Sequence, residues 1–170
     1  WRVRYRHWSS PVEPYRERPT IEPAISPGAS CAMVGAMNVP DWFHGLASAL
    51  DVKMGLELLE VTPTRAVGRY PVAGNTQPFG LWHGGASCVV AETLASLAAA
   101  AEVGPTGTIV GVDINATHLL AVRSGWVTGT ATALRIGGTL ATYDVAIAND
   151  EGQQVCAARI TIALRRGNGG

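Results

Sequence analysis

The most constraining feature of this sequence is an apolar run from Ala86 to Ala101 that contains a single charge, Glu92. Seven of its sixteen residues are Ala, the strongest helix former, and Gly104-Pro105 ends the run. The pattern predicts one long helix from Gly84 to about Glu102. Because that helix is apolar nearly all round, other parts of the protein have to cover most of its surface.

Strand patterns account for most of the remaining chain. Alternating or β-branched runs occupy residues 56–61, 65–72, 110–115, 127–134, 143–147 and 160–164. Turn residues separate the last four of these runs at Ser124-Gly125, Gly137-Gly138 and Asp150-Glu151-Gly152, with a spacing typical of antiparallel hairpins. This order predicts an α+β fold in which a curved antiparallel β-sheet wraps one long central helix.

The first 36 residues differ from the rest of the chain. They hold five of the ten Pro and five of the twelve Arg and show no periodicity, which predicts a disordered N-terminal extension. An arm that binds a membrane or a partner is an alternative, because Trp1, Tyr5 and Trp8 lie among basic residues. We expect a single folded domain over residues 37–166, a flexible tail at 167–170, and a short helix from Asp41 to Ala49.

Composition excludes several classes of protein. Thirteen basic and thirteen acidic residues give a formal net charge of zero, which disfavours general binding to nucleic acid or to an anionic membrane. The three Cys residues are far apart and no Cys-x-x-Cys or His-Glu-x-x-His motif occurs, so we expect no disulfide framework and no metal site. We also expect no membrane span and no signal peptide, and therefore a cytoplasmic protein.

Glu92 is the most informative single residue. An isolated buried carboxylate costs several kcal/mol, so this side chain has to face water, a partner or a functional site. Cys88 and Ser96 lie four residues to either side and share its helical face, which otherwise holds small residues. A solvated face would carry several charges, so the pattern favours a functional carboxylate over a surface one.

His83-Gly84-Gly85 stands where this helix is expected to begin. Gly costs about 1 kcal/mol relative to Ala in a helix, but it leaves the free N–H groups at the positive helix end accessible to an anion or oxyanion. A tight turn into the helix explains the motif equally well. Glu92 lies about 12 Å further along the axis, so one ligand reaches both only through a neighbouring subunit or a curved approach.

The stretch 75–87, which reads NTQPFGLWHGGAS and continues to Ala91-Glu92, resembles the signature of hotdog-fold acyl-CoA thioesterases. A second block, 112–118, also matches, and the likeness runs from about Asp41 to Leu164. It is most similar to the branch that hydrolyses aryl-CoA esters such as 1,4-dihydroxy-2-naphthoyl-CoA and 4-hydroxybenzoyl-CoA. The resemblance implies the hotdog fold.

The resemblance also implies a catalytic role for five residues. Glu92 takes the place of the family's carboxylate, which acts as nucleophile on the thioester carbon or as base for water. The Gly84 N–H polarises the thioester carbonyl, while Gln77 and His83 orient that carbonyl and the thiol leaving group. Ser96 positions the attacking water.

Substrate contacts and assembly follow from the same resemblance. The implied substrate is an acyl-CoA or aryl-CoA, with no cofactor, and the implied substrate-binding residues are Gly85, His118, Arg123, Arg135, Gly137, Gly138 and Thr139. A homodimer or homotetramer is expected, with Glu92 and the Gly84 turn supplied by different subunits. The stretch 94–101 departs from aryl-CoA relatives because it is almost all Ala and Leu, which leaves the acyl group open.

Other functions compete with thioester hydrolysis. A hotdog dehydratase, with His83 as base, is one alternative, and a non-catalytic acyl-CoA-binding protein is another. Glu92 argues against the binding protein, since binding alone gains nothing from a carboxylate in an apolar helix. An α/β-hydrolase is excluded, because the chain has no Gly-x-Ser-x-Gly motif.

Overall fold

The computed structural model describes residues 39–40, 42–43 and 48–167. The extension expected at 1–36, all of the 167–170 tail except Gly167, and most of the helix expected from Asp41 to Ala49 lie outside this part of the chain. The elements, in chain order, are α1 (Ala49–Met54), β1 (Glu57–Thr62), β2 (Arg65–Pro71), α2 (Gly84–Val103), β3 (Thr108–His118), β4 (Trp126–Ile136), β5 (Leu140–Asn149) and β6 (Gln154–Arg165).

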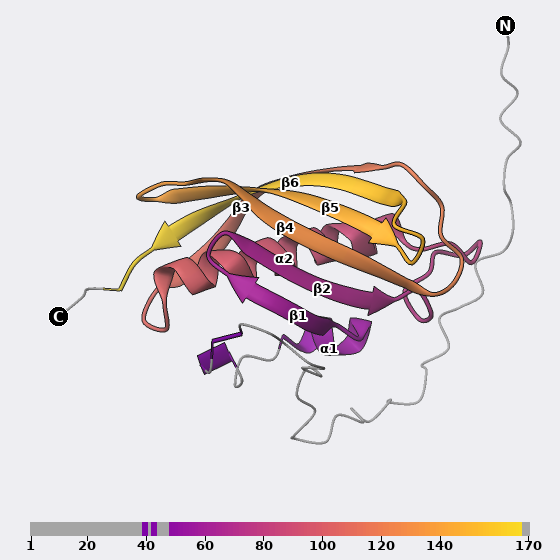
Figure 1. The fold of residues 1–170 in the computed structure, drawn as a ribbon, viewed down its shortest axis with the longest axis horizontal. Helices are drawn as coiled ribbons and strands as arrows, with labels where there is room; N and C mark the ends of the chain where they lie inside the picture. The colour runs from indigo at the N-terminus through magenta and orange to yellow at the C-terminus, as the bar shows by residue number, and fades with distance from the viewer. Residues whose placement is uncertain (1–38, 41, 44–47, 168–170) are drawn as a thin grey trace, which may run out of the picture.

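The six strands form one antiparallel sheet in the order β1-β2-β4-β5-β6-β3. Figure 1 shows the sheet curving around α2, which lies along one of its faces. The α+β architecture expected from sequence, with one long helix and a curved antiparallel sheet, is therefore confirmed. The order leaves β1 and β3 as the two edge strands.

One expected hairpin is wrong. Ser124-Gly125 does not join paired strands, because β3 pairs with β6 at the far edge while β4 pairs with β2 and β5. The connection from β3 instead crosses the end of the sheet. Val122 of this connection is buried, and its carbonyl accepts the backbone N–H of Trp82 at 2.7 Å. The turn residues mark the break in the chain correctly, but they carry no information about which strand comes next in the sheet.

The expected helix from Asp41 to Ala49 is also corrected. Ser48 is the N-cap, its side chain accepting the Asp51 N–H at 3.3 Å, so Ala49 begins a helix rather than ending one. Gly55 ends α1 in the left-handed conformation, with φ 75°. Inside α1, the buried Asp51 carboxylate accepts hydrogen bonds from Thr93 (2.8 Å) and Tyr70 (3.3 Å), which tie α1 to α2 and β2.

Two glycines allow α2 to lie close to the sheet. Gly68 of β2 and Gly129 of β4 face each other across the ladder, and both sit under Leu94 of the helix. A side-chain carbon at Gly129 would lie 2.6 Å from the Leu94 Cδ1 and 2.5 Å from the Val90 Cγ1. A larger residue there would therefore displace these two side chains or push the helix away from the sheet.

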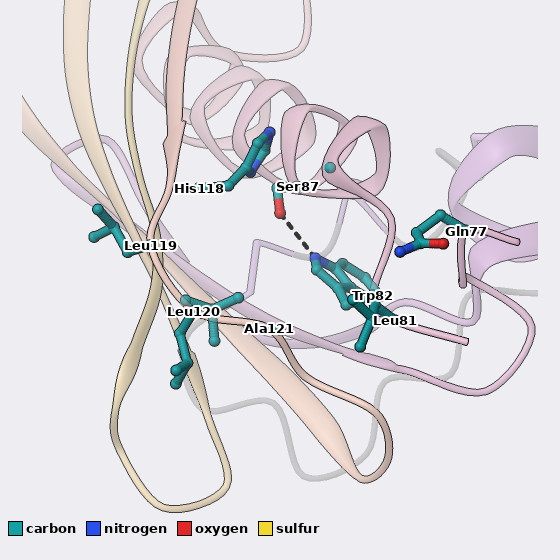
Figure 2. A pocket seen from close by; sticks show the side chains of 10 residues that line it. Gln77, Leu81, Trp82, Ser87, His118, Leu119, Leu120 and Ala121 are labelled. Atoms are coloured by element: carbon teal, nitrogen blue, oxygen red, sulfur yellow. Dashed lines mark hydrogen bonds between the residues drawn. The ribbon is translucent and has the colours of Figure 1, made fainter. Parts of the chain in front are cut away.

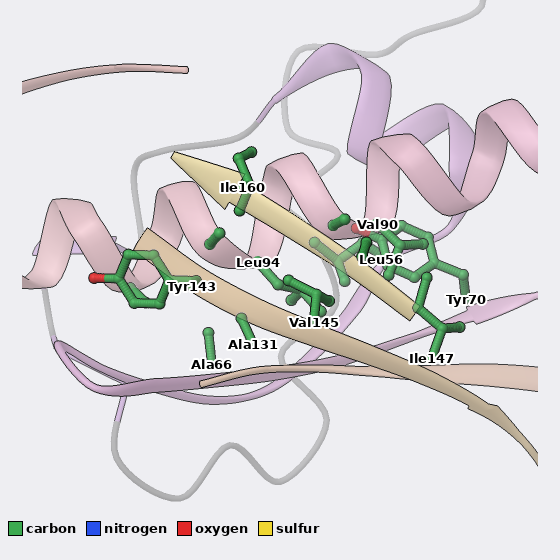
Figure 3. Close-up of a cluster of buried hydrophobic side chains, with 14 of the residues drawn as sticks. Leu56, Ala66, Tyr70, Val90, Leu94, Ala131, Tyr143, Val145, Ile147 and Ile160 are labelled. Carbon is green, nitrogen blue, oxygen red and sulfur yellow. The ribbon is translucent and has the colours of Figure 1, made fainter. Parts of the chain in front are cut away.

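The core lies between α2 and the concave face of the sheet (Figure 3). Leu94, Tyr143, Val145 and Ile160 are completely buried there. Helix α2 has the length and hydropathy of a membrane-crossing helix, with a mean hydropathy of 1.4, but it contacts all six strands. Its apolar surface is therefore explained by its central position in the fold.

Candidate active site

The N-terminus of α2 is shaped by two histidines. His83 is the N-cap residue, and its Nδ1 accepts the Gly85 N–H at 2.8 Å. The His118 ring lies over Gly84, so closely that a side-chain carbon at Gly84 would be 2.7 Å from Nε2. Among the described residues, the Gly84 N–H donates no hydrogen bond. It remains a donor at the positive end of the helix dipole.

Backbone hydrogen bonds hold the loop before α2 in a fixed conformation. Asn75 anchors it, since its Nδ2 donates to the carbonyls of Met54 (2.8 Å) and Pro71 (2.9 Å) while its own carbonyl accepts the His83 N–H at 3.0 Å. The Gln77 backbone N–H donates to the Leu81 carbonyl at 2.8 Å, and the Gln77 Oε1 accepts the Phe79 N–H. These bonds fix the position of Gln77 beside the helix N-terminus.

A cavity of about 340 Å³ opens at this helix N-terminus. Figure 2 shows the residues around it, and its walls are formed by Gln77, Leu81, Trp82, Gly84, Ser87, His118, Leu119, Leu120, Ala121 and Val155. Three residues that sequence analysis assigned to the site, Gln77, Gly84 and His118, therefore meet around one cavity. His83, although adjacent, does not line it.

Glu92 lies away from this cavity. It is half-buried on α2, and its carboxylate packs against Gly111 of the edge strand β3. The β3–β6 ladder is irregular between Gly111 and Asp113, at the same place. Ser96 is also half-buried, one turn further along the helix. Glu92 is eight residues after Gly84, which corresponds to about 12 Å of helix, so one chain does not place the two side by side.

The expected substrate-binding residues fall into two groups. Gly85 and His118 lie at the helix N-terminus, and Arg123 donates to the Phe79 carbonyl at 3.4 Å near the cavity. The second group is at the opposite end of β4, roughly 35 Å away for a strand of this length; it comprises Arg135, Gly137, Gly138 and Thr139. Within one chain, the structure does not bring the two groups together.

The second group is part of a fixed turn. Arg166, which follows β6, donates to the Gly138 carbonyl at 2.6 Å and to Glu102 at 2.7 Å. The Thr139 carbonyl accepts the Leu164 N–H at 2.8 Å. Arg166 is thus a basic residue beside the glycines that sequence analysis did not single out.

Sequence analysis missed most of the cavity wall. Trp82, Ser87 and Val155 were not assigned to the site, and Trp82 stands directly before the His-Gly-Gly motif. Behind this wall, burial raises the pKa of the Cys156 thiol, while a hydrogen bond from the Ser87 hydroxyl acts in the opposite direction. Within the part of the chain that the structure describes, no three His, Cys, Asp or Glu side chains cluster as metal ligands would.

Comparisons with known proteins agree on one family. Residues 79–156 match the family model described as thioesterase superfamily. A 1,4-dihydroxy-2-naphthoyl-CoA hydrolase from Listeria monocytogenes is 36% identical over 118 residues, which cover 69% of this chain and 96% of that protein.

Solved structures support the same assignment. A thioesterase from Haemophilus influenzae has a TM-score of 0.67 and 33% identity, over 72% of this chain and 87% of its own. A Staphylococcus aureus thioesterase has a TM-score of 0.67 and 30% identity, over 69% and 99%. That structure carries a glutamine-to-alanine substitution, and a second structure of the protein carries a glutamate-to-alanine substitution 15 positions further on.

Proposed function

Because this chain belongs to the thioesterase superfamily and has the hotdog fold, we propose that it hydrolyses an acyl-CoA or aryl-CoA thioester to the free acid and CoA. The chain is a thioester hydrolase, as its relatives are, rather than a non-catalytic binding protein or a dehydratase. The name of the Listeria relative supports an aryl-CoA ester resembling 1,4-dihydroxy-2-naphthoyl-CoA as one candidate substrate.

The placement of Glu92 carries this proposal. It is a half-buried carboxylate whose oxygens lie against Gly111, a strand residue with no side chain of its own to cover them. Such a carboxylate attacks the thioester carbon directly or takes a proton from an attacking water. On either route the C–S bond breaks, the acyl carbon gains a hydroxyl oxygen, and the sulfur leaves as the CoA thiol.

The other proposed roles surround the carbonyl. The free Gly84 N–H donates to the carbonyl oxygen as it becomes an oxyanion, which is where a fixed donor accelerates acyl transfer most. Gln77 and His83 orient the carbonyl and the leaving thiol, and Ser96 positions the water. Gln77 and Glu92 are 15 residues apart, the same separation as the glutamine and glutamate that were replaced in the Staphylococcus aureus thioesterase.

The two edges of the sheet favour a dimer through β3. On β1, Glu57 and Glu60 form ion pairs with Arg69 and Arg65, a charged pattern that protects an edge from further pairing. β3, in contrast, exposes Val110, Val112 and Ile114 (59%, 60% and 37%). We therefore propose that β3 pairs antiparallel with β3 of a second copy, which makes a symmetric dimer.

Such a dimer brings Glu92 of one copy close to the Gly84 turn of the other, two groups that are far apart within one chain. Antiparallel pairing reverses the partner strand, so the Gly111 end of β3, with Glu92, approaches the His118 end of the second copy, with its Gly84 turn. The turn at Gly137-Gly138 of one copy approaches the cavity of the other in the same way. Arg123 and Arg135 then both lie within reach of one CoA. Light scattering at micromolar concentration tests the assembly, and a monomer would contradict it.

The experiment that tests the function is a thiol-release assay with benzoyl-CoA. Glu92→Gln keeps the size of the side chain and removes its charge, so kcat should fall at least about a hundredfold with KM little changed. Glu102→Gln is the matched control, because Glu102 lies on the same helix but pairs with Arg166 on the surface. Normal turnover by folded Glu92→Gln protein would overturn the proposed mechanism.

A further inference from the structure

A buried hydrogen bond closes the inner wall of the 340 Å³ cavity. The Trp82 indole Nε1–H donates to the Ser87 Oγ at 2.8 Å (Figure 2). Trp82 is 7% exposed and Ser87 has no exposed surface. Although Ser87 lines the cavity, its side chain already accepts this hydrogen bond and has no exposed surface to offer a ligand.

The rest of the wall is almost entirely apolar. Trp82, Gly84 and Ser87 have been described above. The apolar residues among the others are Leu81, Leu119, Leu120, Ala121 and Val155. Two polar side chains remain, Gln77 and His118. The Gln77 carbonyl oxygen is taken by the Phe79 N–H, and His118 lies over Gly84, where the thioester carbonyl is proposed to bind. The Gln77 NH2 group and the His118 ring both lie beside the helix N-terminus, so within one chain the rest of the wall offers a polar group on the ligand no partner.

Position and chemistry together indicate which part of the substrate enters. Because Gly84 belongs to the wall, a carbonyl bound at its N–H lies at the cavity boundary, where either the acyl group or the CoA arm can enter the cavity. The pantetheine arm of CoA carries two amides, which need hydrogen-bonding partners once they are out of water. An apolar wall suits the acyl group instead. The volume is at the lower end of the range for small-molecule sites.

We propose that this cavity holds the acyl group, and that the Trp82–Ser87 pair makes it selective for acyl groups without a hydroxyl at the end remote from the thioester. This specificity rests on the proposed thioesterase function and narrows it. It distinguishes hydrocarbon acyl groups from hydroxylated ones, a choice that the hotdog fold and membership of the family do not determine. Burying an unpaired hydroxyl against such a wall lowers kcat/KM by roughly ten- to a hundredfold.

The test compares hexanoyl-CoA with 6-hydroxyhexanoyl-CoA. The hydroxyl of 6-hydroxyhexanoyl-CoA lies too far from the carbonyl to change its reactivity. Any difference in kcat/KM between the two esters therefore reports on binding. The wild-type protein should hydrolyse hexanoyl-CoA with a kcat/KM at least about tenfold higher than that for 6-hydroxyhexanoyl-CoA. The unreactive thioethers S-hexyl-CoA and S-(6-hydroxyhexyl)-CoA should show the same order in their dissociation constants by calorimetry.

The Trp82→Phe variant tests the residues themselves. Phe lacks the indole N–H and is smaller, which frees an acceptor site on Ser87 and opens space beside it. The preference for the hydrocarbon substrate should fall at least about fivefold. Trp126→Phe is the matched control, because Trp126 packs against Arg69 on the opposite face of the sheet, and its selectivity should equal that of the wild type.

The outcomes are distinguishable. Equal or reversed wild-type preference would overturn the specificity, and so would an unchanged preference in folded Trp82→Phe protein. If that variant does not fold, the wild-type comparison still decides. If the wild type hydrolyses neither of these CoA esters nor benzoyl-CoA, the proposed function fails. The two thioether affinities then still test whether the cavity discriminates against the hydroxyl.

Discussion

The carboxylate of Glu92 rests directly on the backbone of Gly111, leaving no room for a side chain on that strand residue. Gly111 faces the helix side of β3, next to the irregularity in the β3–β6 ladder. The contact joins the only charged side chain in the long apolar stretch of α2 to the edge of the sheet. The glycine therefore sets where the carboxylate lies relative to any chain that pairs with this edge.

Gly111→Ala should impair turnover while preserving the fold. The added methyl displaces the end of a flexible side chain rather than backbone, so thermal stability should change little, but the carboxylate moves from its position. Moving a catalytic group out of position typically lowers the rate of an enzyme tenfold or more. We therefore expect at least about a tenfold loss of kcat in the thiol-release assay.

A double variant provides the control for that change. In the Glu92→Gln background, Gly111→Ala should add little further loss, since the group it displaces no longer reacts. Fully additive effects would show that Gly111 acts through something other than Glu92, for example through pairing of β3.

Gly84→Pro and Gly84→Ala should differ in rate. Both add a carbon that crowds the His118 ring, but only Pro removes the N–H. Gly84 is the first residue of α2, a position where Pro is well tolerated. We expect kcat of the Pro variant to be about 10²–10³-fold below that of the Ala variant, the usual effect of one oxyanion donor. Equal rates would assign the oxyanion to another donor.

The sequence predicts local structure here better than pairing. The Ala-rich run and Gly104 locate α2 almost to the residue, because helix propensity and its termination are local properties. The position of β3 beside β6 was missed, since it depends on contacts between strands distant in the chain. The Gly68–Gly129 pair under Leu94 carries no local signal either, although it decides how closely the helix approaches.

The site shows the same division. Motif resemblance selected Gln77, Gly84 and His118, and the structure places them around one cavity. It also grouped Arg123 with Arg135, which one chain holds at opposite ends of β4. Trp82 and Ser87 were not selected, because neither a tryptophan before a histidine nor a serine in a helix indicates a buried hydrogen bond between them.

Tyr143 should make stability depend on pH above 10. Burial, with a smaller contribution from the charge of Glu102, raises its pKa from 10.0 to about 12. Between those values the unfolded chain loses the phenol proton and the folded chain keeps it. The stabilisation is therefore complete below pH 10 and is lost as the pH rises toward 12. With the pKa at 10.0 in the unfolded chain and about 12 in the folded protein, the loss by pH 11 is on the order of 1 kcal/mol.

The Tyr143→Phe variant isolates this contribution. At pH 9 it should be about 1 kcal/mol less stable than the wild type, because it lacks the 2.9 Å hydrogen bond from the Tyr143 hydroxyl to the Pro63 carbonyl. By pH 11 the two proteins should be nearly equal in stability. Urea denaturation at the two pH values measures this gap, and a gap that stays constant would show that Tyr143 does not titrate differently on folding.

Truncations should locate the N-terminal boundary of the folded domain. Residues 1–36 are rich in Pro and Arg and lack periodicity, so their removal should leave melting temperature and turnover unchanged.

Removal through Phe43 should behave differently. Phe43 is 3% exposed and its ring stacks on Trp42 with centroids 4.1 Å apart, so these two residues pack with the core. Losing it should lower the free energy of unfolding by at least about 2 kcal/mol, measured by urea denaturation. Phe43→Ala in the full chain separates loss of the ring from loss of chain length, and it should reproduce most of the effect. A large loss of stability on removing residues 1–36 alone would instead place the boundary before residue 37.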